Sequence, residues 1–270
     1  MSKTALLDDR SLISISGEAA TDFLQNLITC DVENLTVDSA TFGALLTPQG
    51  KILFEFLVSK SDNGFLLDCR DDMRSALLKR LMFYRLRAAV DIEADDRKIF
   101  VTWGSDSSRD PRHAGLGQRS YLKAVETNAS KQDWHTLRIS CGVPELGVDF
   151  LTSSTFPHEA MMDQYESAGV DFTKGCYVGQ EVVSRMQHRG TARSRFVHVT
   201  GQTPLPVVGT EILSGEKTIG TMGSSYDKEG LALVRLDRAA AARDIGADIT
   251  CKGVALELKL PLFFAGDWPS

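Results

Sequence analysis

Apolar and polar positions in the first half of the chain alternate between a period of two residues and the 3.6-residue period of a helix. Ile13 and Ile15 lie between serines, which predicts a half-buried strand over residues 11–16. The apolar residues of the next segment, 19–28, recur at helical spacing and predict an amphipathic helix. A strand and a helix therefore follow each other closely near the start of the chain.

Two apolar runs, residues 41–46 and 52–59, flank a Thr-Pro-Gln-Gly segment at residues 47–50. Proline at the second position and glycine at the fourth position are typical of a type I turn. The two runs therefore predict a β-hairpin.

Similar patterns predict the other elements of this half. Helices are expected to begin at Asp71 or Asp72, either of which can cap, and at Ser130, where Asp133 three residues on gives nearly a capping box. Residues 105–117 are polar and contain proline and glycine, which predicts a surface loop. Strands are expected over residues 64–69, 87–93, 98–103 and 121–125. Strands paired with helices, without a regular βαβ period, favour an α+β fold.

The pattern changes after residue 195. Short apolar runs separated by glycine or proline turns, with one expected helix at 237–244, predict a small β-barrel or sandwich. The six strands are expected over residues 196–200, 211–213, 218–222, 231–235, 248–251 and 254–260. We therefore expect two domains, an α+β region at residues 1–194 and a C-terminal β-barrel domain at residues 195–270.

Composition narrows the class of protein. The chain has 270 residues, of which 43% are hydrophobic and 24% charged, as in soluble globular proteins. No run reaches the roughly 18 apolar residues of a membrane helix, and no membrane contact is expected. The first ten residues do not resemble a secretory signal or a transit peptide. Five scattered cysteines without a Cys-x-x-Cys pair predict neither a disulfide framework nor a metal site, and favour a cytoplasmic location.

The richest chemistry lies in the octapeptide of residues 174–181, Lys-Gly-Cys-Tyr-Val-Gly-Gln-Glu. Cys176 lies next to Lys174 and directly ahead of a stretch that predicts a helix. A nearby ammonium and the positive end of a helix both stabilise a thiolate. We expect Cys176 to be a functional thiolate whose charge Lys174 stabilises; the alternative is a small buried hydrophobe in a turn. The other four cysteines lie in or next to apolar segments and are expected to be structural.

The octapeptide closely resembles the signature of the YgfZ-type folate-binding proteins, which are relatives of the aminomethyltransferase (T-protein) of the glycine cleavage system. Further segments that resemble this family are residues 23–31, 47–51, 80–87 and 156–160. The resemblance implies a folate-binding α+β region followed by a C-terminal barrel, which agrees with the pattern of strands and helices.

The resemblance also implies a function. The protein is expected to bind tetrahydrofolate or another folate and to assist iron–sulfur cluster assembly or repair, with the assembly machinery or client enzymes as partners. Glu159 would accept the two parallel donors of a pterin, since a carboxylate pairs well with such donors; the alternative is a first-turn helix carboxylate. Gln180 and Arg185 are further candidate folate-binding residues, Arg185 through the glutamate tail of a folate. No stably bound metal is expected, because a cluster usually needs four cysteine ligands.

The hairpin departs from the T-protein pattern. Where that resemblance would place an acidic pair, the chain has Phe54-Glu55, so one carboxylate is replaced by an aromatic ring. Transfer of an aminomethyl group needs a positioned acid or base. Glu55 is the only acid left on this strand and can equally face solvent. A tetrahydrofolate-dependent one-carbon transferase is therefore the second hypothesis, and an assembly or repair factor is favoured over such an enzyme.

A third hypothesis concerns the charge distribution. The chain has a net charge of −6, whereas residues 174–195 hold five cations and one anion. Such a window can attract a polyanion such as tRNA, and it can equally be a solvated charged face. Aromatic residues do not alternate with these cations, as they do in many nucleic-acid-binding segments.

Overall fold

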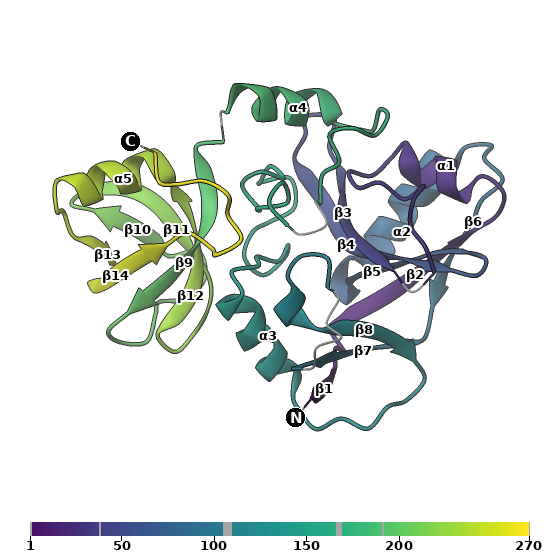
Figure 1. The fold of residues 1–270 in the computed structure, drawn as a ribbon, viewed down its shortest axis with the longest axis horizontal. Coiled ribbons are helices and arrows are strands. Elements are labelled where there is room, and N and C mark those ends of the chain that lie inside the picture. Colours follow the sequence, from purple (N-terminus) through teal and green to yellow (C-terminus); the bar gives the residue numbers. More distant parts are fainter. Residues whose placement is uncertain (1, 38, 105–109, 166–168, 191, 270) are drawn as a thin grey trace.

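The computed structural model of the chain describes residues 2–37, 39–104, 110–165, 169–190 and 192–269. Figure 1 shows a barrel at one end of the molecule and two sheets with their helices at the other. Helix α3 (Lys131–Ser140) lies between these parts, and α4 (Gln180–Arg189) lies along the upper edge of the molecule in this view. The expected mixed α+β region followed by a β-barrel is confirmed.

The larger sheet of the described chain is antiparallel and has the strand order β3-β4-β5-β2-β6. The predicted hairpin joins its first two strands, and Gly50 closes the turn by donating to the Thr47 carbonyl at 2.8 Å. Gly50 has a φ of 80°, which glycine adopts without strain. The bounds are β2 Arg10–Ser16, β3 Ala40–Leu46, β4 Ile52–Ser61, β5 Gly64–Arg70 and β6 Asp91–Asp95.

A smaller antiparallel sheet in the described ranges has the order β1-β7-β8. Its strands are β1 (Lys3–Leu6), β7 (Lys98–Trp103) and β8 (Gln118–Leu122). The pattern did not predict β1, and β8 begins three residues before the expected range. The pairing of β8 with β7 explains this shift, because Gln118 already faces Thr102.

Two helices cover the larger sheet. Helix α1 (Ala20–Gln25) is shorter than expected, and α2 (Asp71–Arg85) begins at the predicted place. Neither acid caps α2, however, because Asp72 accepts from Arg70 and Asp71 accepts from Ser11. Helix α3 begins with the capping box of Ser130 and Asp133, which satisfies two backbone donors reciprocally.

The segment expected to be a surface loop is largely buried in its described part, with Ala114 and Gly115 exposed. Residues 105–109 lie outside the described ranges, whereas Asp110, Arg112 and Leu116 are all buried. Arg112 donates to both carboxylate oxygens of Asp110, at 2.9 and 2.7 Å, and its guanidinium lies over the Phe42 ring. The two charges neutralise each other, which lets a polar segment enter the interior.

The C-terminal strands form a closed barrel with the order β10-β11-β12-β9-β14-β13 in the described part of this region. Each strand contains or overlaps one of the six predicted ranges, and α5 (Leu236–Asp244) is the predicted helix. The bounds are β9 Ser194–Gly201, β10 Glu211–Ser214, β11 Lys217–Tyr226, β12 Glu229–Arg235, β13 Ile249–Cys251 and β14 Val254–Lys259. Within the described ranges, no helix is long and apolar enough to cross a membrane.

Candidate functional site

The octapeptide forms a loop that leads into α4 and packs against the hairpin turn. Gly179, the residue before the helix, has a φ of 82°, and a Cβ atom there would lie 2.6 Å from the Thr47 carbonyl oxygen. At Gly50 a Cβ atom would lie 3.0 Å from the Val182 side chain. Glycine is therefore required on both sides of this contact, which joins two segments that the family resemblance had singled out separately.

Cys176 is exposed in this loop, four residues ahead of α4. At the preceding Gly175 an added Cβ atom would meet nothing within 4 Å outside its two chain neighbours, so the backbone just before the cysteine is open too. The interpretation of Cys176 as a buried hydrophobe is therefore wrong. By contrast Cys30, Cys69 and Cys251 are buried and Cys141 is partly buried.

Burial also sets the protonation of the other thiols. It raises the pKa of Cys30 and Cys69 to about 12 and that of Cys141 to about 11, because a charged thiolate is poorly solvated there. Burial raises the pKa of Cys251 as well. These four cysteines are inert thiols at neutral pH.

Lys174 attaches the octapeptide to the segment that follows α1. Its ammonium donates to the carbonyl oxygens of Ile28 at 2.9 Å and Cys30 at 2.5 Å, and lies over the Tyr177 ring. Burial lowers the pKa of this lysine. The described partners of Lys174 are thus backbone carbonyls and a ring, and stabilisation of a thiolate at Cys176 stays a prediction.

The other candidates near α4 have local partners. Gln180 Nε2 donates to the Gly175 carbonyl at 3.4 Å, a long hydrogen bond that links the helix to the loop. Arg185 pairs with Glu181 one turn earlier, and Arg195 pairs with Asp163. Two of the five cations of the basic window are therefore neutralised. Roles of Gln180 and Arg185 in folate binding, and binding of tRNA by this window, stay predictions.

Glu159 is half buried in the turn that follows Pro157. Its Oε2 accepts from the Phe156 amide at 2.9 Å within a series of turns that form no helix, so the alternative of a first-turn helix carboxylate is wrong. Burial raises its pKa, although that amide, Lys51 and Arg195 favour the charged form. Among the described residues Oε1 has no hydrogen-bond partner, so the carboxylate keeps capacity for further donors.

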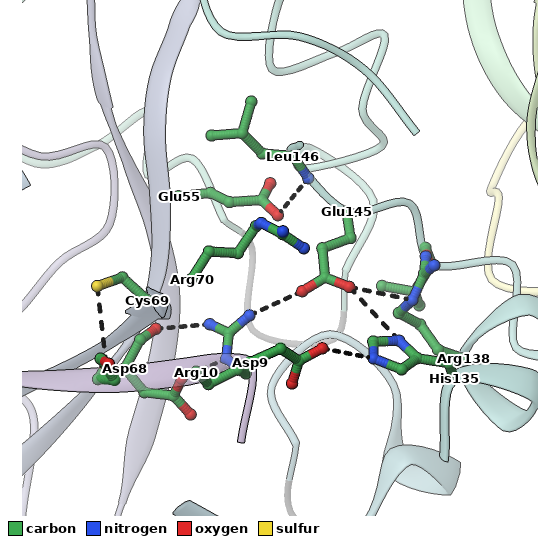
Figure 2. Close-up of polar contacts among 12 residues, drawn as sticks. Asp9, Arg10, Glu55, Asp68, Cys69, Arg70, His135, Arg138, Glu145 and Leu146 are labelled. Carbon is green, nitrogen blue, oxygen red and sulfur yellow. Dashed lines mark hydrogen bonds and ion pairs between the residues drawn. The ribbon is translucent and has the colours of Figure 1, made fainter. Parts of the chain in front are cut away.

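Glu55 points into the molecule, not into solvent as one of the two sequence interpretations had it. Its side chain is 5% exposed, and its Oε1 accepts from the Leu146 amide at 2.8 Å (Figure 2). Burial raises the pKa of Glu55 to about 7, and the neighbouring charge of Glu145 adds to the effect. A carboxyl group with such a pKa can donate or accept a proton near neutral pH.

Glu145 lies beside Glu55 and has the opposite shift. Burial alone would raise its pKa, but the guanidinium groups of Arg138 and Arg10 outweigh burial and lower the pKa to about 2. Arg10 Nη1 donates to Glu145 Oε1 at 2.9 Å, and Arg10 also pairs with Asp68 (Figure 2). Neighbouring carboxyl groups with separated pKa values are characteristic of acid–base sites, and they also occur in structural ion-pair networks.

The same network reaches the barrel through Asp149. Its Oδ2 accepts from Arg138 Nη1 and from the Glu145 amide, both at 2.8 Å. Its Oδ1 accepts from the backbone amide and the hydroxyl of Ser224 on β11, both at 2.6 Å. One carboxylate thus joins α3, the loop after it and the barrel.

The sequence interpretation did not include this charged network. One signal was present, because Asp68 interrupts the apolar strand 64–69 at a position that faces the interior. A charge in such a run indicates a buried partner or a site. The partners themselves could not be found, since Arg10, Asp68 and Glu145 are far apart in the chain. Among the described residues no three His, Cys, Asp or Glu side chains are grouped to hold a metal ion.

The fold is that of the glycine cleavage T-protein. The crystal structure of the glycine cleavage system aminomethyltransferase T from Bartonella henselae is similar with a TM-score of 0.76 over 99% of this chain and 87% of that one. The sequences are 15% identical, so this likeness shows the fold alone. Residues 193–265 match the family model described as the CAF17 C-terminal beta-barrel domain.

Curated relatives define the family more narrowly. The chain is 28% identical to the human iron-sulfur cluster assembly factor IBA57, mitochondrial, over 97% of this chain and 84% of that protein. It is 30% identical to the mitochondrial IBA57 homolog of Pyricularia oryzae, over 86% and 71% of the two chains. It spans 52% of the Neurospora crassa homolog, at 27% identity. The chain belongs to the IBA57/CAF17 family of iron–sulfur cluster assembly factors.

Proposed function

We propose that this protein assists the assembly or repair of iron–sulfur clusters through the thiolate of Cys176. The observation that carries the proposal is the exposed cysteine ahead of α4, in a chain whose other cysteines are buried or partly buried. A thiolate is the usual ligand of cluster iron. Since one sulfur supplies only one ligand, the remaining ligands come from a partner of the assembly machinery or from a client enzyme, and the cluster is cargo.

The test compares Cys176→Ala with Cys141→Ala in cells that lack the protein. Cys176→Ala should lose complementation of iron–sulfur enzyme activity while it keeps its thermal midpoint and folate affinity. Cys141→Ala, at the partly buried cysteine, should complement. Full complementation by Cys176→Ala would contradict the role of the thiol.

We infer that a folate binds with its pterin at Glu159. Support comes from the free capacity of Oε1 and from the half-buried position of the carboxylate, where a charge-assisted pair is strong. Gln180 and Arg185 already bind the Gly175 carbonyl and Glu181. We therefore propose that their side chains change partners when they bind the glutamate tail of a folate. The folate would supply a one-carbon carrier.

Titration of tetrahydrofolate into the wild type and Glu159→Gln tests this pocket, with Glu216→Gln, exposed in the turn between β10 and β11, as the control. Binding should be lost in Glu159→Gln and kept in Glu216→Gln. Equal affinity in all three proteins would exclude Glu159 as the pterin ligand.

We also propose a cytoplasmic location. Because the relatives above are named mitochondrial, imaging of the tagged protein in its own cells tests this location.

A tetrahydrofolate-dependent one-carbon transferase is the second candidate. Its support is the buried position of Glu55, with a pKa raised by burial to about 7 beside the ionised Glu145. Turnover of an aminomethyl donor with tetrahydrofolate, abolished in Glu55→Gln, would establish it. Absence of turnover in the wild type would exclude the transferase and leave the assembly role as the remaining candidate.

A further inference from the structure

The outward face of α2 carries an apolar cluster that no described residue covers. Phe83 is 69% exposed, Leu86 is 84% exposed and Met82 is 43% exposed. Met82 and Phe83 lie in the last turn of α2 and Leu86 directly follows it, so the three exposed side chains lie at the same end of the helix. Leu77 and Leu81, on the opposite face, are buried in the core. Single exposed apolar side chains are ordinary, whereas a contiguous group of large ones is characteristic of an interaction site.

Leu86 adopts a backbone conformation that leucine disfavours. It has a φ of 45° and a ψ of −105°, and the Ala88 amide donates to the Arg85 carbonyl across it at 2.8 Å. These angles are those of the first central residue of a type II′ turn, a position dominated by glycine. The turn itself gives no reason for a leucine.

The rim of this cluster is basic. Residues 79–89 contain four cations and no anion in a chain whose net charge is −6. Lys79, Arg80 and Arg87 are exposed beside the apolar side chains. The charge complement of this surface is therefore acidic.

We propose that this α2 surface, formed by Met82, Phe83 and Leu86 with their basic rim, docks a segment of a partner protein in which apolar side chains are flanked by carboxylates. Apolar anchors would give the affinity, and the rim would give orientation and speed of association. The proposal does not depend on the thiol or on folate.

Two other occupants fit the surface less well. A second copy of the chain in a two-fold contact would place one basic rim against the other, which is repulsive. Helices that lie on membranes carry a long apolar face with cations along the opposite one. Here the exposed apolar cluster is confined to the end of the helix, and the exposed acids Asp71 and Asp72 occupy its beginning.

The experiment places a photoreactive phenylalanine at position 83 of the full-length protein in its own cells, with the same group at Ile245, exposed on the barrel side, as control. The cross-linked segment is identified and synthesised as a peptide. We expect a crosslink specific to position 83, to a segment with apolar residues and carboxylates. Phe83→Ser and Leu86→Gly should each weaken its binding about tenfold or more, and added salt should weaken it further.

Three outcomes would overturn the proposal. The first is a crosslink from position 83 to a second copy of the chain. The second is binding of the wild type, but not Phe83→Ser, to phosphatidylserine vesicles without a protein crosslink. The third is equal peptide affinity in the wild type and Phe83→Ser. Thermal midpoints of both variants are measured alongside, since a side chain this exposed can change without unfolding the protein.

Discussion

At the scale of single residues, two neighbouring glutamates show that the surroundings of a carboxyl group, and not the residue type, decide its pKa. Glu55 and Glu145 are both buried and both carry the same group. Among the described residues Glu55 has one backbone donor and no ion pair with a guanidinium, so burial dominates its pKa. Glu145 has Arg10 and Arg138 within reach, so the ion pairs dominate its pKa. The two groups thus differ in charge at neutral pH because of their partners.

Glu55→Gln is expected to change the pH dependence of stability. The pKa of Glu55 is raised from 4.5 to about 7 in the folded protein, so its contribution is fully present below pH 4.5 and is lost as pH rises through 7. The loss amounts to about 3 kcal/mol. Glutamine keeps an acceptor for the Leu146 amide and does not titrate. Urea unfolding at pH 5 and pH 8.5 should therefore show a smaller loss in the variant; equal losses would contradict the shift.

Leu86→Gly is expected to stabilise the protein. Relief of the unfavourable backbone conformation outweighs the added freedom of glycine in the unfolded chain, for a net gain of about 1 kcal/mol. Arg87→Gly, one residue later, is the control and should lose about 0.5–1 kcal/mol, since only the entropy term applies there. Urea unfolding measures both. A destabilised Leu86→Gly would show that the turn is not strained.

At the scale of elements, the sequence predicted correctly those turns and helix starts that depend only on neighbouring residues. The proline and glycine of the 47–50 turn and the capping box of Ser130 and Asp133 act within a few residues, and both were found. Burial of Asp110 and Arg112 depends on pairing and on the Phe42 ring far away in sequence. The strand β6 begins four residues late because a turn over residues 85–88 intervenes. Non-local packing decides these cases.

The features of the candidate site differ likewise in how far the sequence could predict them. The sequence left open whether Cys176 is a functional thiolate or a buried hydrophobe, and only the structure places it in an exposed loop. The partners of Lys174 are separated from it by 146 and 144 residues, so no pattern near the octapeptide could reveal them. The inward direction of Glu55 was equally open, because alternation along a strand does not say which face is covered.

Asp149→Ala is expected to be strongly destabilising, because Asp149 joins α3, the loop after it and β11. The substitution leaves the buried Arg138 without this partner and the Ser224 amide without its acceptor. Breaking a buried pair costs about 3–5 kcal/mol. The control Asp237→Ala removes an exposed pair with Arg235 and should cost less than about 1 kcal/mol. Similar losses in the free energy of unfolding for both variants, measured with urea, would contradict the stabilising role of Asp149 between α3 and β11.

At the scale of the whole molecule, the buried charges form a continuous path between the two structural regions. It runs from Asp68 on β5 through Arg10 and Glu145 to Arg138, and then through Asp149 to Ser224 in the barrel. The barrel and the sheets are thereby tied through hydrogen bonds as well as through apolar packing, and we expect them to unfold together.

Stability is therefore expected to be greatest at about pH 4.5–5, because the contribution of Glu55 falls above this range and that of Glu145 falls below it. On the acid side the pKa of Glu145 is lowered from 4.5 to about 2, so its contribution is present above 4.5 and is lost as pH falls through 2. That of Asp9, lowered to about 2 by His135 despite its burial, is lost in the same range. On the alkaline side Glu55 acts in the opposite sense. Urea midpoints at pH 3, 5 and 8.5 measure the profile, and a midpoint that rose steadily with pH would contradict it.

The uneven exposure of the five cysteines allows the native chain to be labelled selectively at one of them. Because the buried thiols are held protonated and out of contact with solvent, a brief maleimide pulse on the folded protein should modify Cys176 first. A fluorophore or spin label can thus be placed at the octapeptide without removing a single native cysteine. Its spectrum would then report whether the client enzyme proposed above binds near that loop.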